Sequence, residues 1–453
     1  MTLSFVFGVA ILVINPPLRG PDEQAHFVRI YAYAHGEFIP SVESKGMKGT
    51  LLPPAFYDDN VLFNSVKFNI QKPGFNYRGV FAEYRKRQLQ PAADRSNTPM
   101  FVPFEGSESY TVVAYAPYVV AGIVARLLDL NFVDSLYLMR AAGLVFFTAV
   151  AAYAILIVPW LKWAFVLIAL IPTTLYARTV LGADAATVSF SMVVVALCLR
   201  AVAGQRSRLD RSVWMTLCVL SKPPQIAFIL LEPMLYRWRA LGTKWRTIAI
   251  VILPAIGLTL LWLWLVDAEM AAWRQYADGL YKREYFTLPW KLGFMLENPF
   301  HFPRVMGATF VHEWFALWQQ LIGILGWLDT PLDPWINATF TGLLLVTMLE
   351  RLEVSAPARI RLVGYSMVTA AGYVVAVLFI LFVTWTPPTE EEVWGVQGRY
   401  FLCLLPLVAV IVSALCRKGL PESGQASAAI IGGTLSGVAC IEAIWRVNWV
   451  GLP

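Results

Sequence analysis

The stretch that decides the fold is WMTLCVLSKPPQIAFILLEPMLY, residues 214–236. This apolar block lies between two short segments rich in Arg and Lys, residues 200–211 and 237–246. Short basic segments next to apolar spans stay on the cytoplasmic side of a membrane, so the block should enter the membrane and return. Lys222-Pro223-Pro224 marks the turn, because Pro lacks a backbone donor and disfavours helix at the preceding residue. We expect Lys222 near the outer face.

Composition places the whole chain in a membrane. The 453 residues are 58% hydrophobic and only 15% charged, whereas about a quarter of residues are charged in soluble domains. The net charge of +6 is attributed to membrane topology, and a nucleic-acid partner is not expected. The five cysteines form no CxxC pair and the four histidines form no paired motif, so neither a disulfide framework nor a zinc site is expected.

The fold class expected is an all-α polytopic membrane protein with about 11 transmembrane helices. The first apolar run, residues 3–14, is shorter than the roughly 20 residues that a span needs, so either the helix continues through Asn15 or the chain starts upstream. Two spans come from the halves of residues 214–236. The others are residues 141–159, 163–181, 185–203, 247–266, 335–348, 362–384, 401–415 and 426–444.

The basic segments fix which connections lie outside. Residues 1–453 form one membrane domain, with a long first extracytoplasmic loop at residues 15–134 and a second extracytoplasmic region at residues 267–334. The apolar stretches 111–128 and 305–324 do not fit this parity, and we expect them to be juxtamembrane helices. In the competing reading both are spans, which places the basic segment 200–211 outside, against the positive-inside bias.

The first loop opens with charged residues at helical spacing. In GPDEQAHF, Pro21 suits the first position of a helix, which places Asp22 and Glu23 in its first turn. His26 follows Asp22 by four residues and shares its face. Acids in a first turn also complement the helix dipole, and a histidine one turn later pairs with them, without any functional role.

Three more outer segments carry charge, and each has an ordinary structural explanation. Arg178 and Asp184 lie at the outer end of a helical hairpin, where Arg extends toward the interface and Asp caps the next helix. Lys222 lies at a proline break, where a lysine side chain ordinarily extends to the interface. Gln397, Arg399 and Tyr400 precede an apolar span, where Tyr and Arg commonly form an interface belt.

The predicted topology places all of these groups on one face of the membrane. Carboxylates beside Lys and Arg at headgroup depth suit the phosphate of a lipid carrier, which needs cations, and an acceptor, which needs a base.

Five segments also occur in a characteristic order: GPDEQAHF, LGAD, LSKPP, ILGWLDTPLDP and GVQGRYFLCLLP. Together they resemble the bacterial domain-of-unknown-function 2142 family of polytopic membrane proteins, which is grouped with the GT-C superfamily of lipid-dependent glycosyltransferases. The resemblance covers essentially the whole chain. Gly20, Gln24 and Cys403 stand where that family usually has proline, which changes local backbone geometry but removes no charged group.

The resemblance implies a GT-C-like bundle in the bacterial cytoplasmic (inner) membrane, with its active site facing the periplasm. The implied reaction moves a sugar from a polyprenyl-phosphate-linked donor to a glycan or lipid-linked acceptor of the cell envelope or a surface polysaccharide, with inversion. Asp22 takes the role of general base, with Glu23 as runner-up. Membrane lipid is the surrounding partner.

The other roles follow from charge and position. Arg399 and Lys222, with Arg178 third, are expected to stabilise the leaving phosphate. Asp184 is expected to orient the acceptor, pair with Arg178 or bind a cation, and His26 to position Asp22. Asp22, Glu23 and Asp184 are hard ligands suited to Mg²⁺ or Mn²⁺, a cofactor that some GT-C enzymes use and others do not. The remaining substrate-binding candidates are Gln397, Tyr400 and Trp327, of which the aromatic residues are expected to stack on a sugar.

Two alternatives stay open. A lipid-linked glycan flippase or transporter would place ionisable groups near the midplane in broken helices, and the break at Ser221–Pro224 is its one supporting feature. A non-catalytic membrane subunit would keep the fold and lose the activity, against which Asp22, Lys222 and Arg399 are all present.

Overall fold

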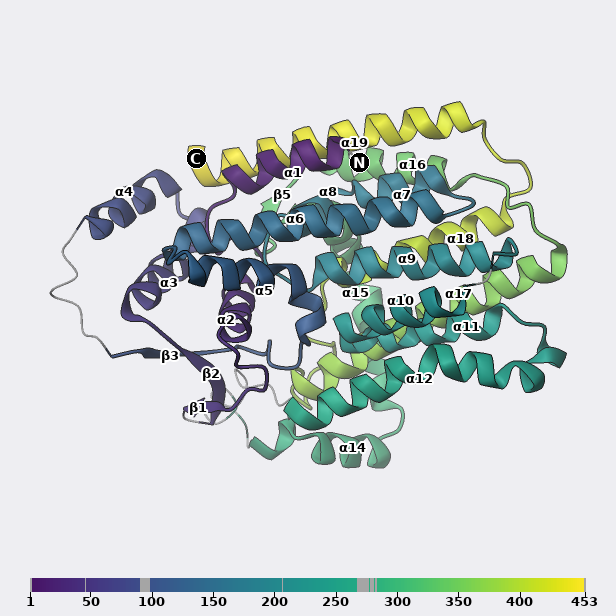
Figure 1. The fold of residues 1–453 in the computed structure, drawn as a ribbon, viewed down its shortest axis with the longest axis horizontal. Helices are drawn as coiled ribbons and strands as arrows, with labels where there is room; N and C mark the ends of the chain where they lie inside the picture. Colours follow the sequence, from purple (N-terminus) through teal and green to yellow (C-terminus); the bar gives the residue numbers. More distant parts are fainter. Residues whose placement is uncertain are drawn as a thin grey trace.

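The computed structural model describes residues 2–44, 46–89, 98–205, 207–266, 277, 281 and 283–451. Long helices lie side by side in a bundle, and a small sheet with short helices occupies one end of it (Figure 1). We call this the sheet end. The opposite end, where the chain passes from α9 to α10, from α16 to α17 and from α18 to α19, is called the loop end.

Six helices among the described residues are long and apolar enough to cross a membrane. This confirms the expectation of an all-α polytopic membrane protein. They are α6 (Phe132–Ile157), α9 (Asp184–Val202), α12 (Leu241–Val266), α17 (Ala356–Thr384), η6 with α18 (Gly398–Leu404 and Leu405–Leu415), and α19 with η7 (Glu422–Trp445 and Arg446–Val450).

The other expected spans are short or broken helices. Pro172 divides residues 163–181 into α7 (Lys162–Ala169) and α8 (Pro172–Ala177), and Lys222 divides residues 214–236 as its two prolines predict. The count of about 11 spans therefore stays a prediction. The remaining pieces are α1 (Thr2–Ile14), α10 (Arg208–Ser221), η3 (Pro223–Leu230), α11 (Leu231–Met234), η4 (Trp238–Ala240) and α16 (Pro334–Met348).

Contacts between connections bring the loop end together. The Glu350 carboxylate, between α16 and α17, accepts a hydrogen bond from the Leu161 N–H, which precedes α7, at 2.7 Å. The Leu420 N–H, before α19, donates to the Leu349 carbonyl at 2.7 Å. The basic connections used to fix the topology therefore lie at one end of the bundle, although Arg206 lies outside the described residues.

The first extracytoplasmic loop folds at the sheet end. Its strands form an antiparallel sheet in the order β1-β2-β3, which pairs Val42 with Gly49 and Leu52 with Met100. Its elements are α2 (Glu23–Ala34), β1 (Val42–Ser44), β2 (Met47–Leu52), α3 (Pro54–Val66), η1 (Asn69–Gln71), α4 (Tyr77–Gln88) and β3 (Met100–Pro103).

Both expected juxtamembrane stretches are helical. The first, α5 (Val112–Leu127), packs along α6 rather than across the bundle (Figure 1), because only the short segment 128–131 joins the two helices. The second, α15 (His301–Gly323), packs on η6, α8 and α16. Around it lie η5 (Arg283–Phe286), α14 (Leu288–Glu297), β4 (Ile324–Leu325) and β5 (Thr330–Pro331). Residues 267–276, 278–280 and 282 of the second external region lie outside the described residues.

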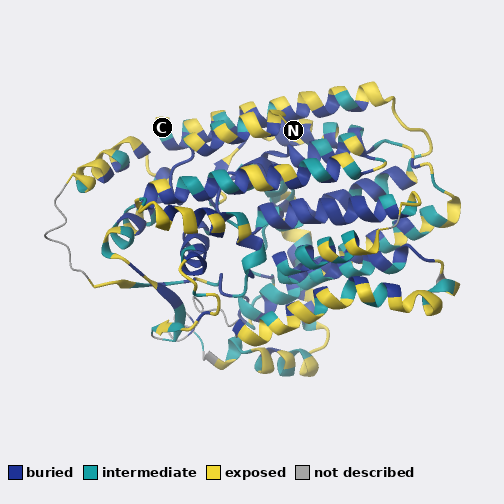
Figure 2. Cartoon of the chain, viewed as in Figure 1, coloured by how far each residue is buried: buried dark blue, intermediate teal, exposed yellow. Residues whose placement is uncertain are grey.

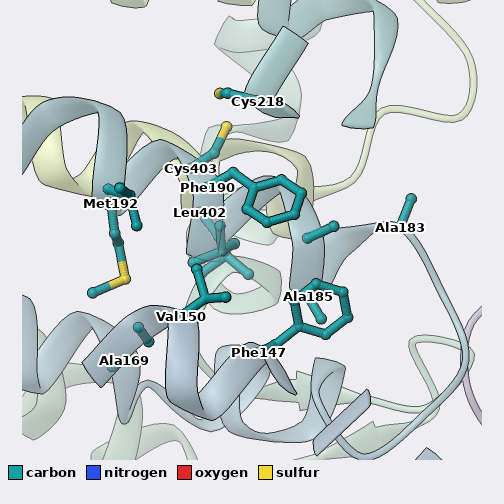
Figure 3. Packing of buried hydrophobic residues seen from close by; sticks show 14 of the residues in the cluster. Phe147, Val150, Ala169, Ala183, Ala185, Phe190, Met192, Cys218, Leu402 and Cys403 are labelled. Atoms are coloured by element: carbon teal, nitrogen blue, oxygen red, sulfur yellow. The ribbon is translucent and has the colours of Figure 1, made fainter. Parts of the chain in front are cut away.

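Helix α9 is the centre of the bundle. It is buried along nearly its whole length, whereas α12 and α19 each expose one side (Figure 2). Residues of α6, α10 and η6 surround it, as Figure 3 shows for Phe147, Phe190, Cys218 and Leu402. A helix buried on all sides has its first residue held in place by packing, and that residue is Asp184.

Candidate functional site

Four charged side chains from distant parts of the sequence meet at one place. Arg399 donates from Nη2 to Asp22 Oδ2 at 2.9 Å, and its Nε lies 3.5 Å from Asp184 Oδ2. Lys222 Nζ donates to Asp184 Oδ1 at 3.2 Å. The chain of contacts Asp22–Arg399–Asp184–Lys222 therefore joins the start of α2, η6, the start of α9 and the break after α10. We call these four residues the charged cluster.

Asp22 is the member of the cluster that reaches solvent. Its side chain is 45% exposed, whereas that of Arg399 is 13% exposed. Helix α2 begins at Glu23, so Asp22 immediately precedes the helix instead of lying in its first turn. Its side chain makes no capping hydrogen bond, and its backbone is left-handed with φ of 53°. This conformation is uncommon for residues other than glycine, but Asp is among those that adopt it most readily.

Glu23 points away from the cluster. Its carboxylate is fully buried and accepts two hydrogen bonds from Arg140 of α6, at 2.7 and 2.6 Å. The same carboxylate accepts the Leu181 N–H at 2.9 Å and the Gly20 N–H at 2.8 Å. Glu23 thus joins α2 to α6 and to the segment before α9, which leaves Asp22 as the acid of this pair that faces the cluster.

Arg140 was not among the site residues predicted from the sequence. It also donates to the carbonyls of Asn15 and Pro16, at 2.7 and 2.9 Å, so one guanidinium holds the exit of α1 and the start of α2. A signal was present, because an arginine beside an apolar span needs a partner inside the protein. That partner could not be identified from local sequence, because Glu23 is 117 residues away.

Lys222 and Tyr400 form a cation–π pair. The Lys222 ammonium lies 4.2 Å from the centre of the Tyr400 ring, and the Tyr400 carbonyl accepts the Tyr373 hydroxyl at 2.9 Å. The residue expected to stack on a sugar therefore contacts a cation of the cluster. Gln397 precedes η6, and its carbonyl accepts the Tyr400 N–H at 3.1 Å. No side-chain hydrogen bond is recorded for Gln397 within the described chain.

Two other candidates lie outside the cluster. Arg178 is buried at the end of α8 and donates to Ser4 Oγ and the Ala169 carbonyl, at 3.2 and 3.0 Å. Trp327 packs under the Lys67 ammonium, which lies 4.0 Å from its ring centre. The structure therefore brings together Asp22, Asp184, Lys222 and Arg399, together with Tyr400 and His26, but not Arg178 or Trp327.

The segment around Trp327 has a structural role that its sequence did not reveal. Asp329 accepts two hydrogen bonds from Arg19, at 3.0 and 2.8 Å, in a buried bidentate pair. Burial acts against the charge of Arg19, but Tyr77, the Asp329 carboxylate and Tyr176 together outweigh it, and the pKa of Arg19 is raised. This pair holds the turn between β4 and β5 against the start of the first loop.

A pocket opens beside the cluster. Its lining includes Pro21, His26, Gly182, Asp184 and Arg399. The His26 ring lies in the wall, with Nδ1 2.6 Å from the Tyr115 hydroxyl, and not against Asp22 as expected. Burial lowers the pKa of His26 to about 4, although the Asp22 and Asp184 carboxylates act to raise it. The imidazole is therefore neutral at neutral pH.

The cluster does not suit a divalent cation. No group of three or more His, Cys, Asp or Glu side chains with metal-binding geometry occurs in the part of the chain that the structure describes. Asp22 and Asp184 each contact a cationic side chain, and Glu23 is held by Arg140. Because Arg399 and Lys222 already supply positive charge beside both carboxylates, the residues present do not fit Mg²⁺ or Mn²⁺.

Comparison with known proteins places the chain in one family. A family model described as "Predicted membrane protein (DUF2142)" matches residues 5–408. No curated protein and no solved structure matches the chain.

Proposed function

The chain belongs to the DUF2142 family of predicted membrane proteins, and on that premise we propose that it is an inverting glycosyltransferase of the GT-C type. It transfers a sugar from a polyprenyl-phosphate carrier to a cell-envelope or surface-polysaccharide acceptor. The observation that carries this proposal is the charged cluster, in which a solvent-exposed carboxylate, Asp22, lies 2.9 Å from a cation that also contacts a second acid.

The reaction is a single displacement. The oxygen of an acceptor hydroxyl attacks the anomeric carbon and forms the new glycosidic bond. The bond from that carbon to the phosphate oxygen breaks, and the phosphate leaves with the electron pair. Asp22 takes the hydroxyl proton, for which it is suited because its carboxylate is the exposed member of the cluster.

The cations stabilise the leaving group. Negative charge grows on the phosphate oxygen as the bond breaks, and fixed cations are most effective where that charge develops. Arg399 and Lys222 are only 13% and 12% exposed, so they act in a region of reduced solvent screening. Asp184 holds both cations in place and prevents them from moving into solvent.

The location follows from the two ends of the bundle. The basic connections lie at the loop end and the first loop folds at the sheet end. We assign the loop end to the cytoplasm under the positive-inside rule. The site then faces the periplasm from a multi-pass protein of the bacterial inner membrane, at the depth of a lipid phosphate.

The test is transfer of a labelled sugar from a polyprenyl-phosphate donor by purified protein in liposomes. Asp22→Asn keeps the shape and removes the base, and we expect transfer to fall by roughly 10²–10⁴-fold, the usual contribution of general base catalysis. The control is Glu83→Gln, because Glu83 is an exposed acid of the same external region. A variant Asp22→Asn that transfers sugar at the wild-type rate overturns the proposal.

A flippase for lipid-linked glycans is the second candidate. Two observations favour it: α7 and α8 are separated at Ile171-Pro172, and α10 and η3 are separated at Lys222. Broken helices of this kind surround substrate sites in transporters. The same liposomes distinguish the two functions, because a flippase moves the labelled lipid between leaflets and yields no covalent product. A non-catalytic subunit would show neither product nor movement.

A further inference from the structure

One hydrogen bond at the pocket fixes the position of a proton. His26 of α2 and Tyr115 of α5 are joined through Nδ1 and the hydroxyl oxygen, 2.6 Å apart. Both side chains are buried. The other side of the imidazole faces Gly182, where a Cβ atom would lie 3.6 Å from His26 Cδ2 and 3.9 Å from Nε2. Gly182 and His26 both line the pocket.

The tyrosine determines which ring nitrogen carries the proton. Within the described residues, His26 Nδ1 is the hydrogen-bond partner of the Tyr115 hydroxyl. If Nδ1 carried the proton, the buried hydroxyl would have no acceptor for its own, which is unfavourable by about 1–3 kcal/mol. Tyr115 therefore donates to Nδ1. A neutral imidazole carries one proton, so that proton is on Nε2, on the side of the ring that faces Gly182.

The surroundings keep this imidazole neutral. Burial is the largest cause and disfavours the charged form; the Asp22 and Asp184 carboxylates favour it but are outweighed, and Arg399 and Lys222 oppose it. The rings of Tyr110 and Tyr115 also contact it, each with its centre 5.6 Å away. A charged histidine would add a third cation to a cluster in which two cations and two carboxylates balance.

We propose that His26 is a fixed, neutral hydrogen-bond donor that binds a phosphate oxygen of the lipid-linked substrate through Nε2–H. The ligand class is a polyprenyl-linked phosphate group, either the singly charged phosphodiester of the sugar donor or the phosphate monoester that leaves it. Arg399, which also lines the pocket, supplies charge to it, and His26 supplies direction. Only the identity of the ligand rests on the proposed function, because the position of the proton follows from the Tyr115 contact and the neutrality of the ring from its burial.

Nitrogen NMR of the histidine side chains tests the proton position without any substrate. The full-length protein is labelled with ¹⁵N-histidine, and His26→Gln identifies the signal among the four histidines. We expect a neutral ring protonated on Nε2 that does not titrate between pH 7 and 5. Tyr115→Phe should then yield a mixture of the two neutral forms. A ring protonated on Nδ1, or one that titrates near pH 6.5, overturns the proposal.

Binding of a polyprenyl phosphate, with the matching polyprenol as comparator, tests the ligand. We expect His26→Ala to weaken polyprenyl phosphate binding by about 10-fold to 100-fold, the range for a hydrogen bond to a charged group, and to leave polyprenol binding unchanged. His26→Gln places an N–H near the Nε2 position and should restore most of the affinity. Equal affinity of wild type and His26→Ala for the phosphate overturns the proposal, and so does loss of affinity only for ligands that carry the sugar.

These measurements stay separate from the proposed function. If wild type and Asp22→Asn both bind polyprenyl phosphate but neither transfers sugar, the glycosyltransferase proposal fails and the role of His26 stands. If transfer occurs and His26→Ala binds the phosphate normally, the role of His26 fails alone. If His26→Ala does not fold, Tyr115→Phe and His26→Gln carry the comparison.

Discussion

At the scale of single residues, two neighbouring acids have opposite environments. Asp22 is half exposed beside Arg399, whereas Glu23 is fully buried against Arg140. The sequence identified both acids as candidates because the pair stands at the start of a helix. The family resemblance ranked Asp22 ahead of Glu23, but the sequence offered no physical reason, because the difference depends on Arg140, which is more than 100 residues away and carries no local motif.

The buried pair should matter for stability rather than for chemistry. Glu23→Gln leaves the Arg140 charge buried without its partner, which should lower the free energy of unfolding by roughly 3–5 kcal/mol. The double variant Glu23→Leu with Arg140→Met should recover most of that loss. Thermal unfolding in detergent measures both, with Glu83→Gln as the exposed control, expected to change by less than about 1 kcal/mol. If Glu23→Gln is fully stable yet inactive, Glu23 has a chemical role.

Burial of neutral His26 should make stability depend on pH. The pKa of His26 falls from 6.5 to about 4 in the folded protein. Between pH 4 and pH 6.5 His26 is therefore protonated in the unfolded chain and neutral in the folded one. Stability from this residue is complete above pH 6.5 and is lost as the pH falls toward 4. The total is roughly 3 kcal/mol. We expect the stability difference between wild type and His26→Gln to shrink over this interval. A difference that stays constant with pH contradicts the lowered pKa.

At the scale of elements, the site is built from helix ends. Asp22 precedes α2, Asp184 begins α9, Lys222 follows α10 and Arg399 lies in η6. The break at Lys222 was predictable from two consecutive prolines. The division of residues 163–181 into α7 and α8 was missed, although Pro172 was a usable signal. No sequence signal predicted the 3₁₀ conformation of η6, because that conformation depends on packing against α15.

Gly398 makes the packing of η6 against α15 testable. Its N–H donates to Gln320 Oε1 at 2.8 Å, and a Cβ atom there would collide with the backbone of Leu317 and Leu321. Gly398→Ala should therefore push η6 from α15, displace Arg399 and reduce both sugar transfer and thermal stability. Gly424→Ala is the matched control, because a Cβ atom at this α19 position meets nothing. Equal activity of the two variants would show that Arg399 tolerates the shift.

At the scale of the whole molecule, the chain has two different ends. The positions of Arg and Lys in the sequence predicted that the basic connections lie on one side of the membrane. Figure 1 places the described ones together at the loop end. The arrangement of the sheet end could not be predicted from the sequence. It depends on long-range contacts such as the pairs Arg19–Asp329 and Arg140–Glu23, which link segments about 310 and 117 residues apart.

The proposed mechanism requires Asp22 to lie on the extracytoplasmic side of the membrane. A cysteine is introduced either at position 22 or at position 205, which lies in the connection between α9 and α10. Cys416 is first replaced by Ser, and the other four native cysteines are buried. A membrane-impermeant maleimide is added to intact bacterial spheroplasts that express each variant. We predict that position 22 reacts in intact spheroplasts and that position 205 reacts only after permeabilisation. Reaction at position 205 in intact spheroplasts, with position 22 protected until they are opened, would contradict the account.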